Sequence, residues 1–381
     1  MARISKDDKK DKPNFTIYDL LIATVKNNAS DLHIKEGSPP TVRIECELIP
    51  IGEYDLTEED CIKFVFEFLS KEQKELVLSG NEVDLAISIP EGRFRVNAFL
   101  QRNIPSAAYR KLFTDLPTFE DLNLPPVLKK LADFNNGLLL VTGPAGSGKS
   151  TTLASIINYI NHHQKKHIIT LEEPIEYIHT DKFSIITQRE VGTDTSSFSN
   201  GLKMSLRQDP NVILVGEMRD PDTIMTAVTA AETGHFVLST LHTPNSIQAI
   251  DSIIDVFSGE QQKQFRILLA NTLKCVISQK LLVRRDNDKR IPAVEIMTST
   301  STIRSLILES KTHEIYQYIV QGKLEGMVTF TESLFQLYKK GLITYEDALY
   351  HAERPTELRL LMDGQSSVTE TIIHDNLIDW L

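Results

Sequence analysis

The sequence has little cysteine and no long apolar run. Its three cysteines lie far apart and form no CxxC pair, which argues against a disulfide scaffold or a cysteine zinc site. No stretch approaches the roughly 18 apolar residues of a membrane-spanning helix, and the opening MARISKDDKK lacks the apolar core of a secretory signal. We therefore expect a cytoplasmic protein. The formal net charge of −11 argues against a protein that coats nucleic acid, because such proteins present excess positive charge.

Local composition and apolar pattern change along the 381 residues and indicate separate domains. We expect a loose lead over 1–15, a smaller α+β domain over 16–112, a linker over 113–126, an α/β domain over 127–364 and a tail over 365–381. The linker segment is rich in proline and aspartate, which favours an irregular connection. The chain is long enough for two domains, each with its own core.

The first domain shows the two-residue period of antiparallel strands. DLHI and TVRI alternate apolar and polar residues around the turn GSPP, and VDLAISIP and RFRVNAFL alternate around EG, which predicts antiparallel strands that share a sheet. Between them, EEDCIKFVFEFL is typical of a helix with Thr57 as its N-cap. The predicted apolar face of this helix comprises Ile62, Val65, Phe66 and Leu69.

The second domain has a different pattern. The short continuous apolar runs LLLVT, HIITL, NVILVG and HFVLSTL alternate with helical stretches. Such runs predict a parallel sheet covered by helices on both faces. The stretch LLVRRDNDKRIPAVEIM predicts a hairpin, and mostly helical sequence follows it.

The segment GPAGSGKST matches the phosphate-binding pattern G-x-x-x-x-G-K-[ST]. Glycines let backbone N–H groups close around phosphates at a helix N-terminus, where the helix dipole favours anions. We expect Lys149 to reach the β- and γ-phosphates of a nucleoside triphosphate and the Ser150 hydroxyl to bind Mg²⁺. An apolar strand pattern precedes the segment and a helical pattern follows it, which argues against a glycine-rich turn without a ligand. The predicted nucleotide-binding residues are Gly143, Pro144, Ala145, Gly146, Ser147, Gly148, Lys149, Ser150 and Thr151.

Acidic residues and a histidine follow other strands of the predicted sheet. Ligands of open α/β sheets bind beyond the carboxyl ends of the strands, so Glu217 is expected beside the γ-phosphate, where it would polarise the attacking water. Glu172 and Glu173 end another strand and are candidates to hold Mg²⁺ through water; a solvated loop is the alternative. His242 is expected to sense the γ-phosphate. His235 begins the same strand, and for this residue both a role in the site and a structural role are open.

The first domain contains a pair of arginines with a predicted register. If the chain turns at Arg102 and Asn103, Arg95 and Arg110 lie directly opposite one another. Two like charges across a strand pair are destabilising unless an anion lies between them. We therefore consider both as arginine fingers, which stabilise charge in phosphoryl transfer. Two solvated arginines, or another register, are the alternatives.

Several motifs together resemble a known family. GPAGSGKST, LEEPIEYIH, LRQDPNVILVGEMRD and AETGHFVLSTLHT resemble the Walker A motif, Asp box, atypical Walker B motif and His box of the type II/IV secretion ATPase superfamily. SDLHI, FRVNAF, ITQREVGTDTSSF and STIRSLI narrow the resemblance to the twitching-motility (type IV pilus retraction) ATPases of the PilT/PilU family. FLQRNIPS, LPPVLKKLA and ITYEDALYHAERPTELRLLM are more similar to the accessory, PilU-like members.

The resemblance implies a fold and a mechanism. It implies a PAS-like N-terminal domain and a RecA-like P-loop ATPase domain with a helical C-terminal part, assembled as a homo-hexamer with ATP between the two domains. Glu217 would be the general base, with Arg95 and Arg110 as arginine fingers and Glu172 and Glu173 on the magnesium side. ATP hydrolysis would drive pilus retraction at the cytoplasmic face of the inner membrane. Implied partners are the inner-membrane pilus platform protein and a paralogous retraction ATPase, with peripheral membrane association and no nucleic acid.

Some features depart from the family pattern or leave alternatives open. The Asp box reads EEP where EDP is common, so the carboxylate of Glu173 lies one methylene further out. STIRSLI makes Arg304 a candidate coupling residue. An accessory ring ATPase, a pilus-extension or type II secretion ATPase, and a DNA-translocating ATPase remain alternatives. The last rests on the basic hairpin RRDNDKR, which also fits a solvated loop tip. In the tail, Ile373, Leu377, Trp380 and Leu381 suit either docking on their own domain or docking on a partner.

Overall fold

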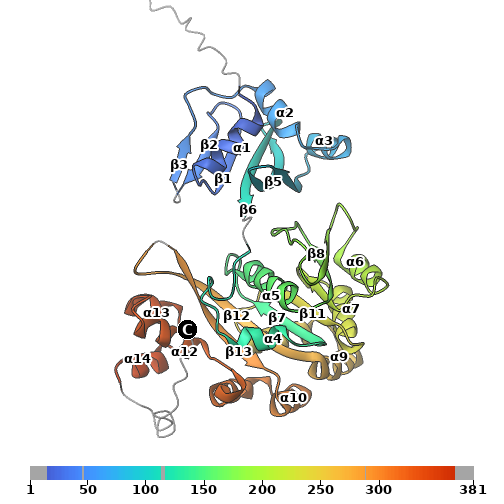
Figure 1. The fold of residues 1–381 in the computed structure, drawn as a ribbon, viewed down its shortest axis with the longest axis vertical. Helices are drawn as coiled ribbons and strands as arrows, with labels where there is room; N and C mark the ends of the chain where they lie inside the picture. The colour runs from blue at the N-terminus through green and yellow to red at the C-terminus, as the bar shows by residue number, and fades with distance from the viewer. Residues whose placement is uncertain (1–14, 45–46, 113–115, 288, 365–381) are drawn as a thin grey trace, which may run out of the picture. The chain divides into compact units, whose positions relative to one another are not determined.

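The computed structural model describes residues 15–44, 47–112, 116–287 and 289–364. The chain divides into two compact units (Figure 1). The first falls within Met1–Asp115 and includes Pro174–Ile178, and the second falls within Leu116–Glu173 and His179–Leu381. Most of the expected lead, 1–15, and the whole tail, 365–381, lie outside the described residues.

Unit 1 contains an antiparallel sheet in the order β3-β2-β1-β6-β5-β4. Its strands are β1 (Asp31–Ile34), β2 (Thr41–Ile44), β3 (Glu47–Pro50), β4 (Val83–Ile89), β5 (Gly92–Gln101) and β6 (Ile104–Leu112). The two predicted strand pairs, β1 with β2 and β4 with β5, are confirmed. Arg102 and Asn103 turn the chain between β5 and β6 with φ of 53° and 66°, as expected for a two-residue hairpin loop.

The helices of unit 1 begin with side-chain caps. They are α1 (Ile17–Lys26), α2 (Glu58–Phe66) and α3 (Lys71–Leu78). Thr57 accepts a hydrogen bond from the backbone N–H of Asp60, which confirms it as the N-cap of α2. The predicted apolar face of α2 was partly wrong: Val65 is buried as expected, but Ile62 is 39% exposed, and Cys61 and Phe64 are buried instead. Apolar residues lie on several sides of α2, so spacing alone did not select the buried side.

Unit 2 is built on a largely parallel sheet in the order β13-β12-β7-β11-β10-β8-β9. Its strands are β7 (Gly137–Thr142), β8 (His167–Glu172), β9 (Ile185–Glu190), β10 (Val212–Val215), β11 (Phe236–Leu241), β12 (Leu273–Val283) and β13 (Arg290–Thr298). Only β13 runs antiparallel to its neighbour within this sheet. Every residue of β7, β10 and β11 is buried, which confirms the parallel sheet predicted from continuous apolar runs.

Helices cover both faces of this sheet (Figure 1). Residues of α4 and α5 contribute to the core on one face, and residues of α7 to α11 contribute to the core on the other. The bounds are α4 (Val127–Ala132), α5 (Lys149–His163), α6 (Phe198–Ser205), α7 (Pro221–Glu232), α8 (Ser246–Asp255), α9 (Gly259–Thr272), α10 (Ser301–Leu308), η1 (Thr312–Glu314), α11 (Ile315–Gln321), η2 (Gly322–Glu325), α12 (Phe330–Lys339), α13 (Tyr345–His351) and α14 (Pro355–Met362).

The C-terminal helices form a separate small core with the β12–β13 hairpin. Leu282 and Ile291 of the hairpin are buried together with Phe330 and Leu334 of α12 and Leu358 of α14. Figure 1 shows α12, α13 and α14 (red) grouped beside the hairpin. The hairpin and the mostly helical sequence after it are thus as predicted.

Part of the segment expected to be a linker belongs to the core of unit 2. Phe119 and Leu124 are 3% and 4% exposed and lie in the same apolar cluster as Ile156 of α5.

Among the described residues, no helix is long and apolar enough to span a bilayer.

Candidate nucleotide site

The segment 143–151 connects the end of β7 to the start of α5. Gly148 is the N-cap of α5 and has φ of 90°, a conformation that favours glycine. Gly143 has φ of 146°. A Cβ atom at Gly143 would collide with the carbonyl oxygen of Gln279 and would lie 2.6 Å from the Ser147 Oγ. The loop therefore needs glycine at both places. It leads into the N-terminus of α5, the end of a helix that favours anions.

Lys149 is the first residue of α5 and is 8% exposed. Its Nζ lies 2.9 Å from the carbonyl oxygens of Gly143 and Pro144, so its ammonium is held at the mouth of the loop. The Oγ of Ser147 is buried and has no recorded hydrogen-bond partner. A buried cation and a buried hydroxyl beside a helix N-terminus fit the phosphates of a nucleotide.

The sequence did not predict the residues that support this loop from β12. Gln279 is 3% exposed, and its Oε1 accepts a hydrogen bond of 2.8 Å from the Oγ1 of Thr152 on α5. On the preceding residue, the Ser278 hydroxyl accepts a bond of 2.9 Å from Thr142, the last residue of β7. Polar residues in a buried strand were the available signal, but they did not identify β7 as the neighbour of β12.

Glu217 follows β10, and His242 follows the adjacent strand β11. The rule that ligands bind at the carboxyl ends of strands predicted both positions. The structure places His242 Nε2 3.4 Å and Arg219 Nε 2.6 Å from the Oε1 of Glu217. Because both contacts involve Oε1, the other oxygen of Glu217 can face a ligand. The hydrogen bond between Arg219 and Glu217 raises the pKa of the Arg219 guanidinium, so Arg219 stays positively charged.

His235 lies away from this group. It precedes β11, and its Nδ1 lies 2.9 Å from the carbonyl oxygen of Ala230 on α7. This contact favours the structural role that was its alternative.

Glu172 ends β8, and Glu173 follows as an exposed residue. The Oε1 of Glu172 accepts hydrogen bonds from the Thr170 hydroxyl at 2.7 Å and from the Gln188 amide at 3.3 Å. No group of three or more histidine, cysteine, aspartate or glutamate residues suitable for a metal occurs in the described part of the chain. Mg²⁺ in nucleotide sites uses one or two carboxylates with phosphates and water. Ser150, Glu172 and Glu173 offer donors of these types, and their binding of Mg²⁺ stays a prediction.

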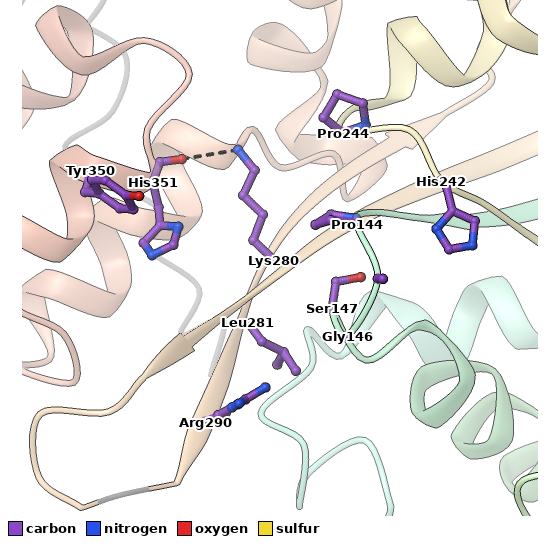
Figure 2. A pocket seen from close by; sticks show the side chains of 11 residues that line it. Pro144, Gly146, Ser147, His242, Pro244, Lys280, Leu281, Arg290, Tyr350 and His351 are labelled. Carbon is purple, nitrogen blue, oxygen red and sulfur yellow. Dashed lines mark hydrogen bonds between the residues drawn. The ribbon is translucent and has the colours of Figure 1, made fainter. Parts of the chain in front are cut away.

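A cavity of about 510 Å³ opens beside the tip of the loop (Figure 2). Figure 2 shows Lys280 on one side and His242 on the other, with Pro144 and Ser147 between them. The Nζ of Lys280 donates to the His351 carbonyl oxygen and lies 3.2 Å from Glu353. The lining residues are Pro144, Ala145, Gly146, Ser147, His242, Pro244, Lys280, Leu281, Arg290, Tyr350 and His351.

Unit 1 contains the predicted arginine pair. Arg95 and Arg110 are direct partners in the β5–β6 register, as predicted. The two positive charges do not lie opposite one another uncompensated, as we expected, because each arginine already faces a carboxylate. Arg110 Nε donates to Asp31 at 2.9 Å, and Arg95 lies 3.5 Å from Asp84. The like charges therefore do not require a ligand anion, although the Arg110 side chain remains 71% exposed.

Two other basic residues were singled out by the sequence. At the hairpin tip, Arg284 donates to both carboxylate oxygens of Asp286, which offsets its charge there. Arg304 lies on α10, and its buried Nε has no recorded partner. Its role in coupling stays a prediction.

A glycine-rich loop between a parallel strand and a helix, with a carboxylate after another parallel strand of the same sheet, defines a P-loop nucleotide-binding protein. The profile of the type II/IV secretion system protein family matches residues 113–373. The chain belongs to this family. Because the family is one of P-loop ATPases, the predicted fold class and the predicted ATPase class are both confirmed.

Individual relatives agree with this assignment. The chain is 41% identical to the type IV pilus ATPase PilU of Pseudomonas aeruginosa over 344 residues, 90% of each protein. It is also 41% identical to the type IV pilus retraction ATPase PilT of the same organism, covering 89% of this chain and 98% of PilT. The crystal structure of the pilus retraction motor PilT with bound ADP has a TM-score of 0.85 at 42% identity, with coverage of 91% and 99%. The predicted resemblance is confirmed.

Proposed function

We propose that this chain is an ATPase motor that hydrolyses ATP to drive type IV pilus retraction. The observation that carries the proposal is 41% identity to PilU and to PilT over about nine tenths of the chain. The chain also has the complete glycine-rich loop and Glu217 at the end of β10. A nucleotide-binding fold alone would leave the work of the motor open.

In this proposal, the residues of unit 2 have distinct tasks. The loop 143–151 binds the phosphates through its N–H groups, with Lys149 on the β- and γ-phosphates. Glu217 accepts the proton of the attacking water through the oxygen that does not contact Arg219 and His242. Charge on the phosphates is neutralised when Mg²⁺ is bound by Ser150 and, through water, by Glu172 and Glu173.

The arginines of unit 1 complete the proposed chemistry. Arg95 and Arg110 serve as arginine fingers, which stabilise the charge of the transferring phosphoryl group. The strand register alone requires no anion between them, but the Arg110 side chain is 71% exposed and can reach a ligand. His242 links the γ-phosphate to Glu217 and so reports whether ATP or ADP is bound.

We further propose a homo-hexamer that is peripheral to the membrane, at the cytoplasmic face of the inner membrane. Its partner there is the pilus platform protein, and a paralogous retraction ATPase is a second partner. The equal identity to PilU and PilT supports a second candidate function, an accessory ring ATPase beside another motor.

The test is a deletion strain complemented with wild type or with Glu217→Gln. Retraction predicts excess surface fibres and lost twitching in the deletion strain, and both are corrected by wild type only. Full rescue by Glu217→Gln would favour the accessory role, in which binding suffices. Absence of fibres in the deletion strain would contradict retraction and indicate pilus extension.

A further inference from the structure

Glu295 is a carboxylate within the apolar strand β13 and has no part in the proposed chemistry so far. Glu295 is 3% exposed. Burial of an ionised carboxylate costs free energy unless other groups compensate for it. Burial raises the pKa of Glu295, and hydrogen bonds from Ser246 oppose that shift. A buried acid kept in a strand of apolar neighbours therefore calls for a specific partner.

That partner is the start of α8. The Oε1 of Glu295 accepts a hydrogen bond of 2.9 Å from the backbone N–H of Ser246 and one of 2.7 Å from its hydroxyl. Ser246 is the first residue of α8, so the carboxylate also lies at the positive end of the helix dipole. Asn245 accepts from the N–H of Gln248, and together these contacts fix the first turn of the helix.

The loop that ends at Ser246 is short and carries His242. Only residues 242–245 separate the end of β11 from α8. At the other end of this loop, His242 Nε2 lies 3.4 Å from Glu217. The Ser246 hydroxyl is also 3.4 Å from that of Ser278, which accepts a bond from Thr142 just before the phosphate loop. The buried carboxylate of Glu295 thus holds the end of the 242–245 loop, and His242 at the beginning of this loop contacts Glu217, the proposed base.

We propose that Glu295 is a positioning residue for ATP hydrolysis, which holds Ser246 so that the 242–245 loop keeps His242 against Glu217. This inference rests on the ATPase function proposed above. Glu295 contacts no nucleotide in this scheme and acts only through the loop. Displacement of a catalytic group by about 1 Å can cost about a hundredfold in rate, so loss of the Glu295 contacts should slow turnover more than it weakens ATP binding.

The test compares steady-state ATP hydrolysis by the full-length protein carrying Glu295→Ala, Glu295→Gln or no change. Glu295→Ala removes both bonds, so kcat should fall at least about tenfold while KM for ATP stays within about twofold. Glu295→Gln keeps an oxygen acceptor of the same shape and should restore kcat to within about threefold of wild type. Glu309→Ala, which removes an exposed carboxylate paired with Lys311, is the matched control.

A double-mutant cycle with His242→Ala separates positioning from a general structural role. If Glu295 acts through His242, Glu295→Ala should cost no more than about twofold in the His242→Ala background. Ser246→Ala supplies the same cycle if Glu295→Ala does not fold. Multiplicative losses in the double variant, or wild-type kcat in folded Glu295→Ala, would overturn the inference and leave the ATPase function standing. No hydrolysis by wild type would overturn both.

Discussion

Asp31 lies within a row of charges across the sheet of unit 1, and its replacement gives a quantitative test of that row. The strand register aligns Arg43, Asp31, Arg110 and Arg95 on neighbouring strands. The Asp31 side chain is 10% exposed and lies 2.9 Å from Arg110 and 3.7 Å from Arg43. Asp31→Asn removes this charge while it keeps the shape of the side chain, and so leaves the arginines without their central carboxylate.

The expected cost follows from the exposure of the partners. A hydrogen bond to a charged group contributes about 1.5–3 kcal/mol. Since the Arg110 side chain is 71% exposed, solvent screening reduces the expected loss of unfolding free energy to about 1–2 kcal/mol. Asp84→Asn is the control, because Asp84 is 47% exposed and 3.5 Å from Arg95, and it should cost below about 0.5 kcal/mol.

The dependence on pH has a definite sign. Burial raises the pKa of Asp31, but hydrogen bonds from Arg110 and Ser30 and the charge of Arg110 lower it below its ordinary value of 3.8. A lowered folded-state pKa means that the stabilisation is present above pH 3.8 and is lost as pH falls through the folded-state value. The difference between wild type and Asp31→Asn should therefore shrink in acid.

The assay is pulsed hydrogen exchange along a urea series on the full chain, read by mass spectrometry on peptides from β1 and β6. The series is run at about pH 7 and at about pH 3, on either side of the ordinary carboxyl pKa. Equal losses for Asp31→Asn and Asp84→Asn, or a gap that persists unchanged in acid, would refute the reasoning about this charge row.

Two further predictions concern the proposed ATP chemistry. Arg95→Ala and Arg110→Ala should each lower kcat for ATP hydrolysis by at least about a hundredfold, because arginine fingers stabilise transition-state charge; Lys63→Ala on α2 is the control, and normal turnover in both variants removes the finger role. Gly143→Ala should weaken nucleotide affinity at least about tenfold, since its Cβ collides with the neighbouring strand, whereas the Cβ of Gly146→Ala meets nothing within 4 Å and costs less; calorimetric titration with ADP checks this order.

Local sequence patterns predicted much of the fold, because a strand or helix depends largely on the residues within its own short segment. Continuous apolar runs predicted the buried parallel strands, and alternation predicted the hairpins. The register of Arg95 with Arg110 was also predictable, because a two-residue turn at Arg102 and Asn103 leaves little freedom between adjacent strands. The exposed position of Ile62 on α2 was missed because apolar residues lie on more than one side of that helix.

The parts of the site that depend on contacts between distant segments of the chain could not be predicted from the sequence. The glycine-rich loop and Glu217 were recognisable because each belongs to one short motif after a strand. Asp31 was not foreseen as the partner of Arg110, since 79 residues separate them and only the β1–β6 pairing joins them. Glu295 was given no role from the sequence, because its partner is the start of α8, 49 residues away.

The most direct measurement is steady-state ATP hydrolysis by the purified wild-type chain and by Glu217→Gln, at matched oligomeric state and with nucleotide binding measured in both. We expect Glu217→Gln to bind ATP as tightly as wild type but to hydrolyse it at least about a hundredfold more slowly, because the general base is lost while the phosphate loop is intact. Equal hydrolysis rates in the two proteins would contradict the account.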